Sequence, residues 1–148
     1  MNLFGMLEIS GSAMTAERQR AQIVVSNMAN AQTTQTSAGG PYRRQLVVFR
    51  AQRHAEFPTT MLLAANGGHA GAGEGVRVSQ VIADSKPPIL RYEPGNPDAD
   101  SKGYVAYPAV DPIEEMTDLL GAVRAYELNA SAVQAAKGMI QQSMDILK

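Results

Sequence analysis

The stretch from Met116 to Leu147, MTDLLGAVRAYELNASAVQAAKGMIQQSMDIL, decides the fold. Its main apolar stripe advances in alternating steps of three and four residues, which is the 3.5-residue repeat of a coiled-coil seam. Lys137 is the one break in this repeat. The predicted seam consists of Met116, Leu119, Val123, Tyr126, Ala130, Val133, Ile140, Met144 and Leu147. We therefore predict a long C-terminal helix that packs along another helix.

The preceding motif, VDPIEEM, predicts where this helix begins. Asp111 stands where an N-cap belongs, and Pro112 occupies the first helical position. Glu114 falls at the capping-box position, and Glu115 adds negative charge near the positive end of the helix. We interpret both glutamates as capping residues.

A similar seam runs along the N-terminal segment, from Leu3 to about Ala31. Its members are Leu3, Leu7, Met14, Ala21, Val24 and Met28. The segment ends in VVSNMANAQTTQT, where Asn27 and Asn30 are three residues apart. Asn30 or a close neighbour is predicted to end the helix. Asn27 is predicted to bond to neighbouring backbone or side chains and so to fix the helix register.

Each predicted helix carries a second apolar strip when successive residues are turned by about 100°. In the first helix this strip holds Ile9, Ala13, Ala16 and Ile23, with Asn27 on it and Asn30 at its edge; in the second it holds Leu128, Ala132, Ala135, Met139 and Ile146. The pattern alone fits a core helix of a bundle equally well. Because only two long helices are present, we expect other subunits to cover the extra strips.

The predicted subunit interface combines both kinds of strip. It comprises Ile9, Ala13, Met14, Ala21, Ile23, Val24, Asn27, Met28, Asn30, Met116, Leu119, Val123, Tyr126, Ala130, Ala132, Val133, Met139, Ile140, Met144 and Leu147.

Between the helices lies a Gly- and Pro-rich region with four β-like runs. These runs are residues 42–49, 75–82, 89–93 and 103–107, and residues 65–75 form a glycine-rich loop that we expect to be flexible. The predicted fold class is therefore α+β. Long terminal helices (1–36 with the exit turn, and 111–148) pair as a coiled coil, and a small antiparallel β domain (37–110) is inserted between them and projects from the stalk.

Composition and motifs exclude several functions. With 148 residues, a net charge of −1 and no cysteine, the chain has no general attraction to nucleic acid, and lipid insertion is not expected. His54 and His69 have no ligand partner at short spacing, and Asp98 and Asp100 are best explained as turn residues. We expect no metal, no cofactor and no catalytic set, and the N-terminal MNLFGMLEIS does not look like a cleavable signal peptide.

The two ends of the chain resemble those of a known family. SGSAMTAERQRAQIVVSNMANAQTT is similar to the N-terminal signature of flagellar rod and hook proteins, the axial protein family. The C-terminal helix resembles theirs through Arg124, Ala125, Tyr126, Glu127 and Asn129. The middle motifs GGPYRRQLVVF and YEPGNPDADSKGYVAYP are similar to those of proximal rod subunits.

This resemblance implies a non-enzymatic structural subunit of the basal-body rod, the drive shaft that transmits torque. It implies export without a cleaved signal peptide and assembly in the periplasmic space with other rod proteins and copies of itself. The rod–membrane-ring junction protein and the membrane ring would be further neighbours, with the peptidoglycan-level ring outside. The residues alone leave one alternative open: a soluble adaptor that does not polymerise, with a two-helix clamp and a protein-binding β module.

Overall fold

A computed structural model describes residues 3–52 and 75–146 of the chain. Most of the predicted glycine loop, both histidines and Leu147 lie outside these residues. In chain order the elements are α1 (Leu3–Ala29), β1 (Gln45–Ala51), β2 (Val76–Ala83), β3 (Ile89–Tyr92), β4 (Tyr104–Tyr107) and α3 (Pro112–Ile146). The α+β class is confirmed, and both predicted helices form where expected.

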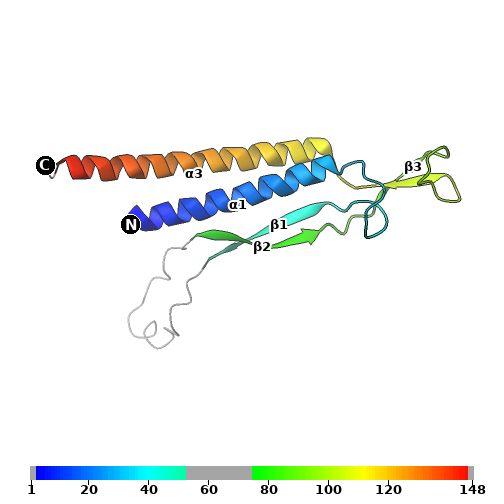
Figure 1. Ribbon diagram of the computed structural model, residues 1–148, viewed down its shortest axis with the longest axis horizontal. Coiled ribbons are helices and arrows are strands. Elements are labelled where there is room, and N and C mark those ends of the chain that lie inside the picture. Colours follow the sequence, from blue (N-terminus) through cyan, green and yellow to red (C-terminus); the bar gives the residue numbers. More distant parts are fainter. Residues whose placement is uncertain (1–2, 53–74, 147–148) are drawn as a thin grey trace, which may run out of the picture.

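The two helices pack side by side in opposite directions, so both chain ends lie at the same end of the molecule (Figure 1). Within the described residues, α3 packs against α1 and against no other helix or strand. The buried residues of α3 are Glu115, Ala122 and Ala136. From one to the next, these residues are seven or fourteen positions apart and lie on one line along the helix. Each comes one residue before a position of the predicted repeat: Met116, Val123 and Lys137.

The predicted seam matches the contact between α1 and α3 only in part. Leu119, Val133 and Ile140 are half-buried, and Val24 of α1 is buried, so coiled-coil pairing stays a prediction. Met116 is 56% exposed, and Val123 and Tyr126 are each 43% exposed, because the line of closest approach runs through alanines. Small side chains let the two backbones approach each other, and the larger apolar side chains then lie beside the contact. The apparent break at Lys137 has the same origin, since Ala136 is buried and Lys137 is exposed.

Helix α1 is covered on two sides. One side packs on α3, and another packs on the ribbon formed by β1 and β2, which lies along the helix (Figure 1). Ala16 is only 2% exposed, and Ile23 lines the space between α1 and β1. The expectation that other subunits alone cover the second strip of α1 is thus wrong in part, because the chain's own ribbon covers some of it.

All four predicted strands are present, but they form two separate antiparallel ribbons instead of one sheet. β1 pairs with β2, with a bulge between Val48 and Phe49, and β3 pairs with β4. The β1–β2 ribbon lies against α1, whereas the β3–β4 ribbon extends beyond the end of the helix pair (Figure 1). Only the second ribbon projects in the way that the sequence predicted.

The turn between β3 and β4 is held by the side chain of Asp100. Asp100 Oδ1 accepts hydrogen bonds from the N–H groups of Lys102 and Tyr104, each at 2.8 Å. Gly103 has a φ of 80°, in the left-handed region that glycine adopts without strain. Two ring contacts stiffen the ribbon: Tyr92 meets Tyr104 edge-to-face at 5.4 Å, and the Arg91 guanidinium lies 4.7 Å from the ring centre of Tyr107. The interpretation of Asp100 as a turn residue is confirmed.

Candidate subunit interface

A buried polar cluster joins α1, β1 and α3 where the two helices meet the first ribbon. Asn27, 1% exposed, donates from Nδ2 to the Gln45 carbonyl at 2.9 Å and to Glu115 Oε2 at 3.0 Å. Its Oδ1 accepts from the Tyr42 hydroxyl and from the Gln45 N–H, each at 2.9 Å. One amide therefore ties together the end of α1, the start of β1 and the first turn of α3.

Arg44 supplies the positive charge of this cluster. Its Nε donates to Glu115 Oε1, Nη1 lies 3.1 Å from Glu114 Oε1, and Nη2 lies 3.5 Å from Asp118 Oδ2. Glu115 is fully buried and Arg44 is 8% exposed. Burial lowers the pKa of Arg44, but the hydrogen bond and charge of Glu115, with those of Glu114, raise it by more, so the net pKa lies above its usual value. The guanidinium stays charged throughout the physiological range.

These contacts correct the interpretation of the two glutamates. Asp111 does cap α3, because its Oδ1 accepts the Ile113 N–H at 2.9 Å. Glu114 instead pairs with Arg44, and Glu115 is a buried member of the cluster. Sequence reasoning missed Arg44 because nothing in the Arg43–Arg44 pair indicates which arginine is buried or that its partner lies 71 positions away.

Both asparagine predictions are confirmed as local contacts. Asn27 bonds to backbone and to side chains, as expected, but its partners belong to its own chain. Asn30 follows the last residue of α1, and its Nδ2 donates back to the Ser26 carbonyl at 2.9 Å. Thr33 Oγ1 then donates to Asn30 Oδ1 at 3.2 Å, so the threonine leads the chain away from the helix.

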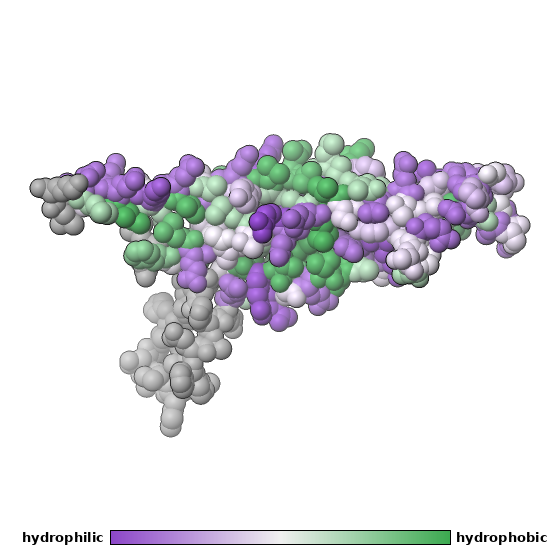
Figure 2. Space-filling view, in the orientation of Figure 1, coloured by the Kyte–Doolittle hydropathy of each residue, from purple (hydrophilic) through white to green (hydrophobic). Residues whose placement is uncertain are grey.

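Helix α3 presents two apolar strips that nothing in the described chain covers. The first lies on its N-terminal half and consists of Ile113, Met116, Leu120 and Val123; the second lies on its C-terminal half and consists of Leu128, Ala132, Ala135, Met139 and Ile146. Every member of both strips is exposed, with Leu128 at 72% and Ile146 at 84%. Figure 2 shows hydrophobic surface of this kind along the helices and over the β1–β2 ribbon.

The predicted interface residues fall into four groups. Val24 and Asn27 are buried within the chain, and Leu147 is outside the described residues. Half-buried members are Ala13, Met14, Ala21, Ile23, Met28, Asn30, Leu119, Ala130, Val133 and Ile140. Exposed members are Ile9, Met116, Val123, Tyr126, Ala132, Met139 and Met144.

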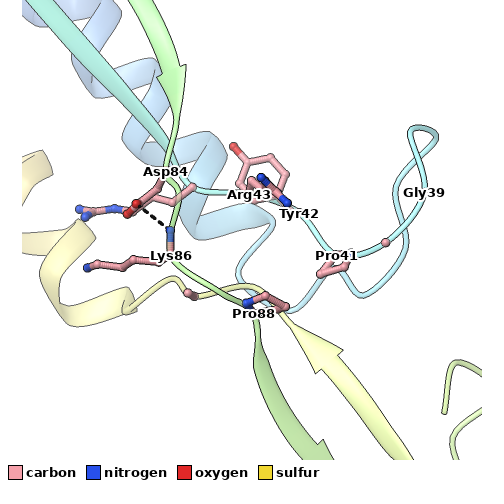
Figure 3. A pocket seen from close by; sticks show the side chains of 10 residues that line it. Gly39, Pro41, Tyr42, Arg43, Asp84, Lys86 and Pro88 are labelled. Carbon is pink, nitrogen blue, oxygen red and sulfur yellow. Dashed lines mark hydrogen bonds between the residues drawn. The ribbon is translucent and has the colours of Figure 1, made fainter. Parts of the chain in front are cut away.

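The pocket drawn in Figure 3 has a volume of about 230 Å³ and lies where β1 begins and β2 leads toward β3. Pro41, Tyr42, Lys86 and Pro88 are among its lining residues, and Asp84 Oδ1 accepts the Lys86 N–H at 3.1 Å. Its walls combine prolines with surface charges and present no nucleophile beside a base. No group of three potential metal ligands occurs within residues 3–52 and 75–146. Of the helices described, none combines the length and apolar character needed to cross a membrane.

Comparison with known proteins identifies the class first. A family model described as "Flagellar basal body rod FlgEFG protein C-terminal" matches residues 101–146, which include all of α3. The C-terminal helix is thus the part of the chain that resembles flagellar rod proteins in this comparison.

Full-length relatives narrow this class. Proteins called flagellar basal-body rod protein FlgC are similar to the chain: that of Bacillus subtilis (strain 168) is 40% identical over 152 residues, with all of both chains covered. That of Escherichia coli O6:H1 is 38% identical and covers 99% of this chain and 98% of its own, and that of Aquifex aeolicus is 34% identical and covers 100% and 99%. The chain belongs to the FlgC family of flagellar basal-body rod proteins, a structural family without enzymatic activity.

Proposed function

We propose that this chain is a subunit of the proximal rod and that it assembles with copies of itself and with other rod proteins through its terminal helices. The observation that carries the proposal is the pair of uncovered apolar strips on α3. Leu128, Met139 and Ile146 are 72%, 46% and 84% exposed. Monomeric proteins rarely expose a long row of apolar side chains, and such rows usually mark interaction sites. Helices of neighbouring subunits are the natural cover for strips of this length.

A second contact surface lies along one side of the α1–α3 pair. Met14, Ala21 and Met28 of α1 are half-buried, and Met116 and Val123 of α3 are exposed. At about 100° per residue, the α1 residues and the α3 residues each lie beside the helix–helix contact. Because the helices are antiparallel, both sets lie on the same side of the helix pair. Together they would form an apolar surface on which a neighbouring helix could pack.

Torque transmission needs contacts that resist sliding. The interlocked strips would supply this resistance because a shift in register would bring charged side chains such as Lys137 against apolar neighbours. Burying an unpaired charge is costly, so the aligned register would be strongly preferred. Small residues such as Ala132 and Ala135 allow close approach between helices.

The position in the cell follows from the family resemblance. The rod would cross the periplasmic space, and its subunits would be exported by the flagellar type III apparatus without a cleaved signal peptide. Neighbours would include the rod–membrane-ring junction protein and the membrane ring, with the peptidoglycan-level ring outside. The projecting β3–β4 ribbon is the element best placed to reach such outer neighbours.

The test is a charge placed in the second strip of α3. We expect Ala132→Glu to abolish rod assembly and motility while export of the chain stays normal. Gln134→Glu is the matched control, because Gln134 is exposed on a different side of the same helix. Its rods should be normal. Normal rods and motility in the Ala132→Glu strain would refute the proposed interface.

Location distinguishes the rod subunit from an adaptor. An epitope-tagged chain expressed from its own promoter should copurify with intact basal bodies. Sedimentation of the purified chain gives a second measure, since an adaptor would be a well-folded monomer or dimer in isolation. A tagged chain that supports motility but stays outside the basal body would overturn the rod assignment.

A further inference from the structure

Two arginines stand directly opposite each other on the β1–β2 ribbon. Arg50 and Arg77 are register partners, so their side chains emerge on the same face, and both are exposed. Like charges in directly opposed positions destabilise a ribbon. Neither arginine has an ion-pair partner among residues 3–52 and 75–146. Two exposed guanidinium groups side by side are suited to binding an anionic group.

The face around the two arginines is suited to a protein partner. Val48 and Gln80 form the next register pair on this face, and both are exposed, Val48 at 38%. The surface thus combines two guanidinium groups with an apolar and an amide side chain. Guanidinium groups favour carboxylates, which they bind through two parallel hydrogen bonds, and they also stack on aromatic rings.

The chain itself carries a surface of complementary chemistry. The turn segment from Glu93 to Lys102 has three carboxylates and one cation. Asp98 and Asp100 are exposed within it. Tyr92 and Tyr104 flank the turn and are 65% and 41% exposed. Carboxylates beside exposed tyrosine rings match a surface of paired arginines beside an exposed valine.

These two surfaces are separated within one molecule. Arg50 and Arg77 are near the end of the β1–β2 ribbon farthest from β3, whereas the acidic turn lies at the tip of the opposite end (Figure 1). A contact between them must therefore join two molecules. Because the two surfaces differ, the contact is heterologous and can repeat from copy to copy.

We propose that Arg50 and Arg77 of one copy bind the carboxylates of the Glu93–Lys102 turn of a second copy. This contact rests on the proposed rod function and adds to it, since it links subunits through their β ribbons in addition to their helices. It also gives the unfavourable arginine pair a role, because carboxylates of the second copy would relieve the repulsion between the two guanidinium groups.

Charge reversal of one arginine tests the contact without weakening the ribbon. Arg77→Glu places a carboxylate opposite Arg50, which favours the hairpin over the parent pair. We nevertheless expect the amount of chain recovered in basal bodies to fall at least about tenfold. Arg43→Glu is the matched control, because Arg43 is also exposed and outside every ion pair of the described residues, and its recovery should be unchanged.

The reciprocal change tests the identity of the partner. Asp98→Arg should reduce assembly like Arg77→Glu, and the double variant Arg77→Glu/Asp98→Arg should restore it. Normal assembly of Arg77→Glu, or a double variant no better than the single ones, would overturn the proposal. If the wild-type tagged chain were absent from basal bodies, the rod function would fail instead, so the two failures are distinguishable.

Photo-crosslinking identifies what covers the arginine face. With p-benzoylphenylalanine at position 48, irradiation of intact basal bodies should give an adduct of two copies, mapped by mass spectrometry to residues 93–102. An adduct with a different protein, or no adduct, would refute the second copy as the occupant.

Discussion

Replacing Arg44 with methionine tests the buried cluster most directly. Methionine keeps the length of the side chain and removes its charge and its donors. Glu115, which is fully buried, would then retain only the Asn27 amide as a donor, at 3.0 Å. The Glu115 side chain would thus lose its positively charged partner while remaining buried.

The magnitude follows from the burial of each partner. Removing one member of a buried ion pair costs about 3 to 5 kcal/mol. The contacts of Arg44 with Glu114 and Asp118 add little, because those side chains are 54% and 39% exposed and exposed pairs contribute about 0 to 1 kcal/mol. We therefore expect Arg44→Met to lower the free energy of unfolding by about 3 to 5 kcal/mol.

The reverse change should be milder. Glu115→Gln keeps the shape of the side chain, and Arg44 keeps Glu114 and Asp118 as partners at 3.1 and 3.5 Å. We expect a loss of about 1 to 2 kcal/mol, since no charge is left alone. In the double variant Arg44→Met/Glu115→Gln, the loss should be smaller than the sum of the two single losses.

The assay is urea unfolding of the purified chain at neutral pH, followed by far-ultraviolet circular dichroism, with free energies obtained by linear extrapolation. An unchanged slope among the variants would show that the same surface unfolds in each. If Arg44→Met lost no more stability than Glu115→Gln, or if the two losses were additive, the burial argument would be refuted.

Three further substitutions test separate parts of the fold. Asn27→Leu removes four hydrogen bonds and should cost about 2 to 4 kcal/mol in the same unfolding assay; unchanged stability would show that the Asn27 amide does not hold the cluster together. Asp111→Ala removes the acceptor of the Ile113 N–H and should lower the free energy of unfolding by about 1 kcal/mol, whereas Asp111→Ser should leave it nearly unchanged. Equal losses in the Ala and Ser variants would argue against capping by Asp111. Gly103→Ala places a Cβ 2.9 Å from the Tyr92 ring at a φ of 80°, so hydrogen exchange in β3 and β4 should accelerate, and an unchanged rate would contradict the strain.

Much of the fold could be predicted because it depends on local signals. The cap at Asp111, the four strand-like runs and the turn residue Asp100 depend on neighbours within a few residues, and each formed where predicted. The position of the second strip on α3 was also predictable, because helical spacing places its apolar residues on one face of the helix.

The pairing of distant elements could not be predicted in the same way. Two apolar strips on one helix do not reveal which face contacts the partner helix. In the structure the contact runs through Ala122 and Ala136, which belong to neither predicted strip. The Arg44–Glu115 pair joins residues 71 positions apart, a separation that no periodicity reports. Glu115 is the clearest case, because its position fits a helix-capping residue but its main partner is the distant Arg44.

The pairing of the first helix with the last has a consequence for how the chain acquires its structure. Asn27 and Glu115 are separated by 88 positions, so a nascent chain must be nearly complete before α3 can reach α1. Until then the α3-facing side of α1 stays open to water or to other proteins, and closing so long a loop carries an entropic cost. The two helices can therefore pair only late in synthesis, and a chain truncated before Pro112 would lack α3.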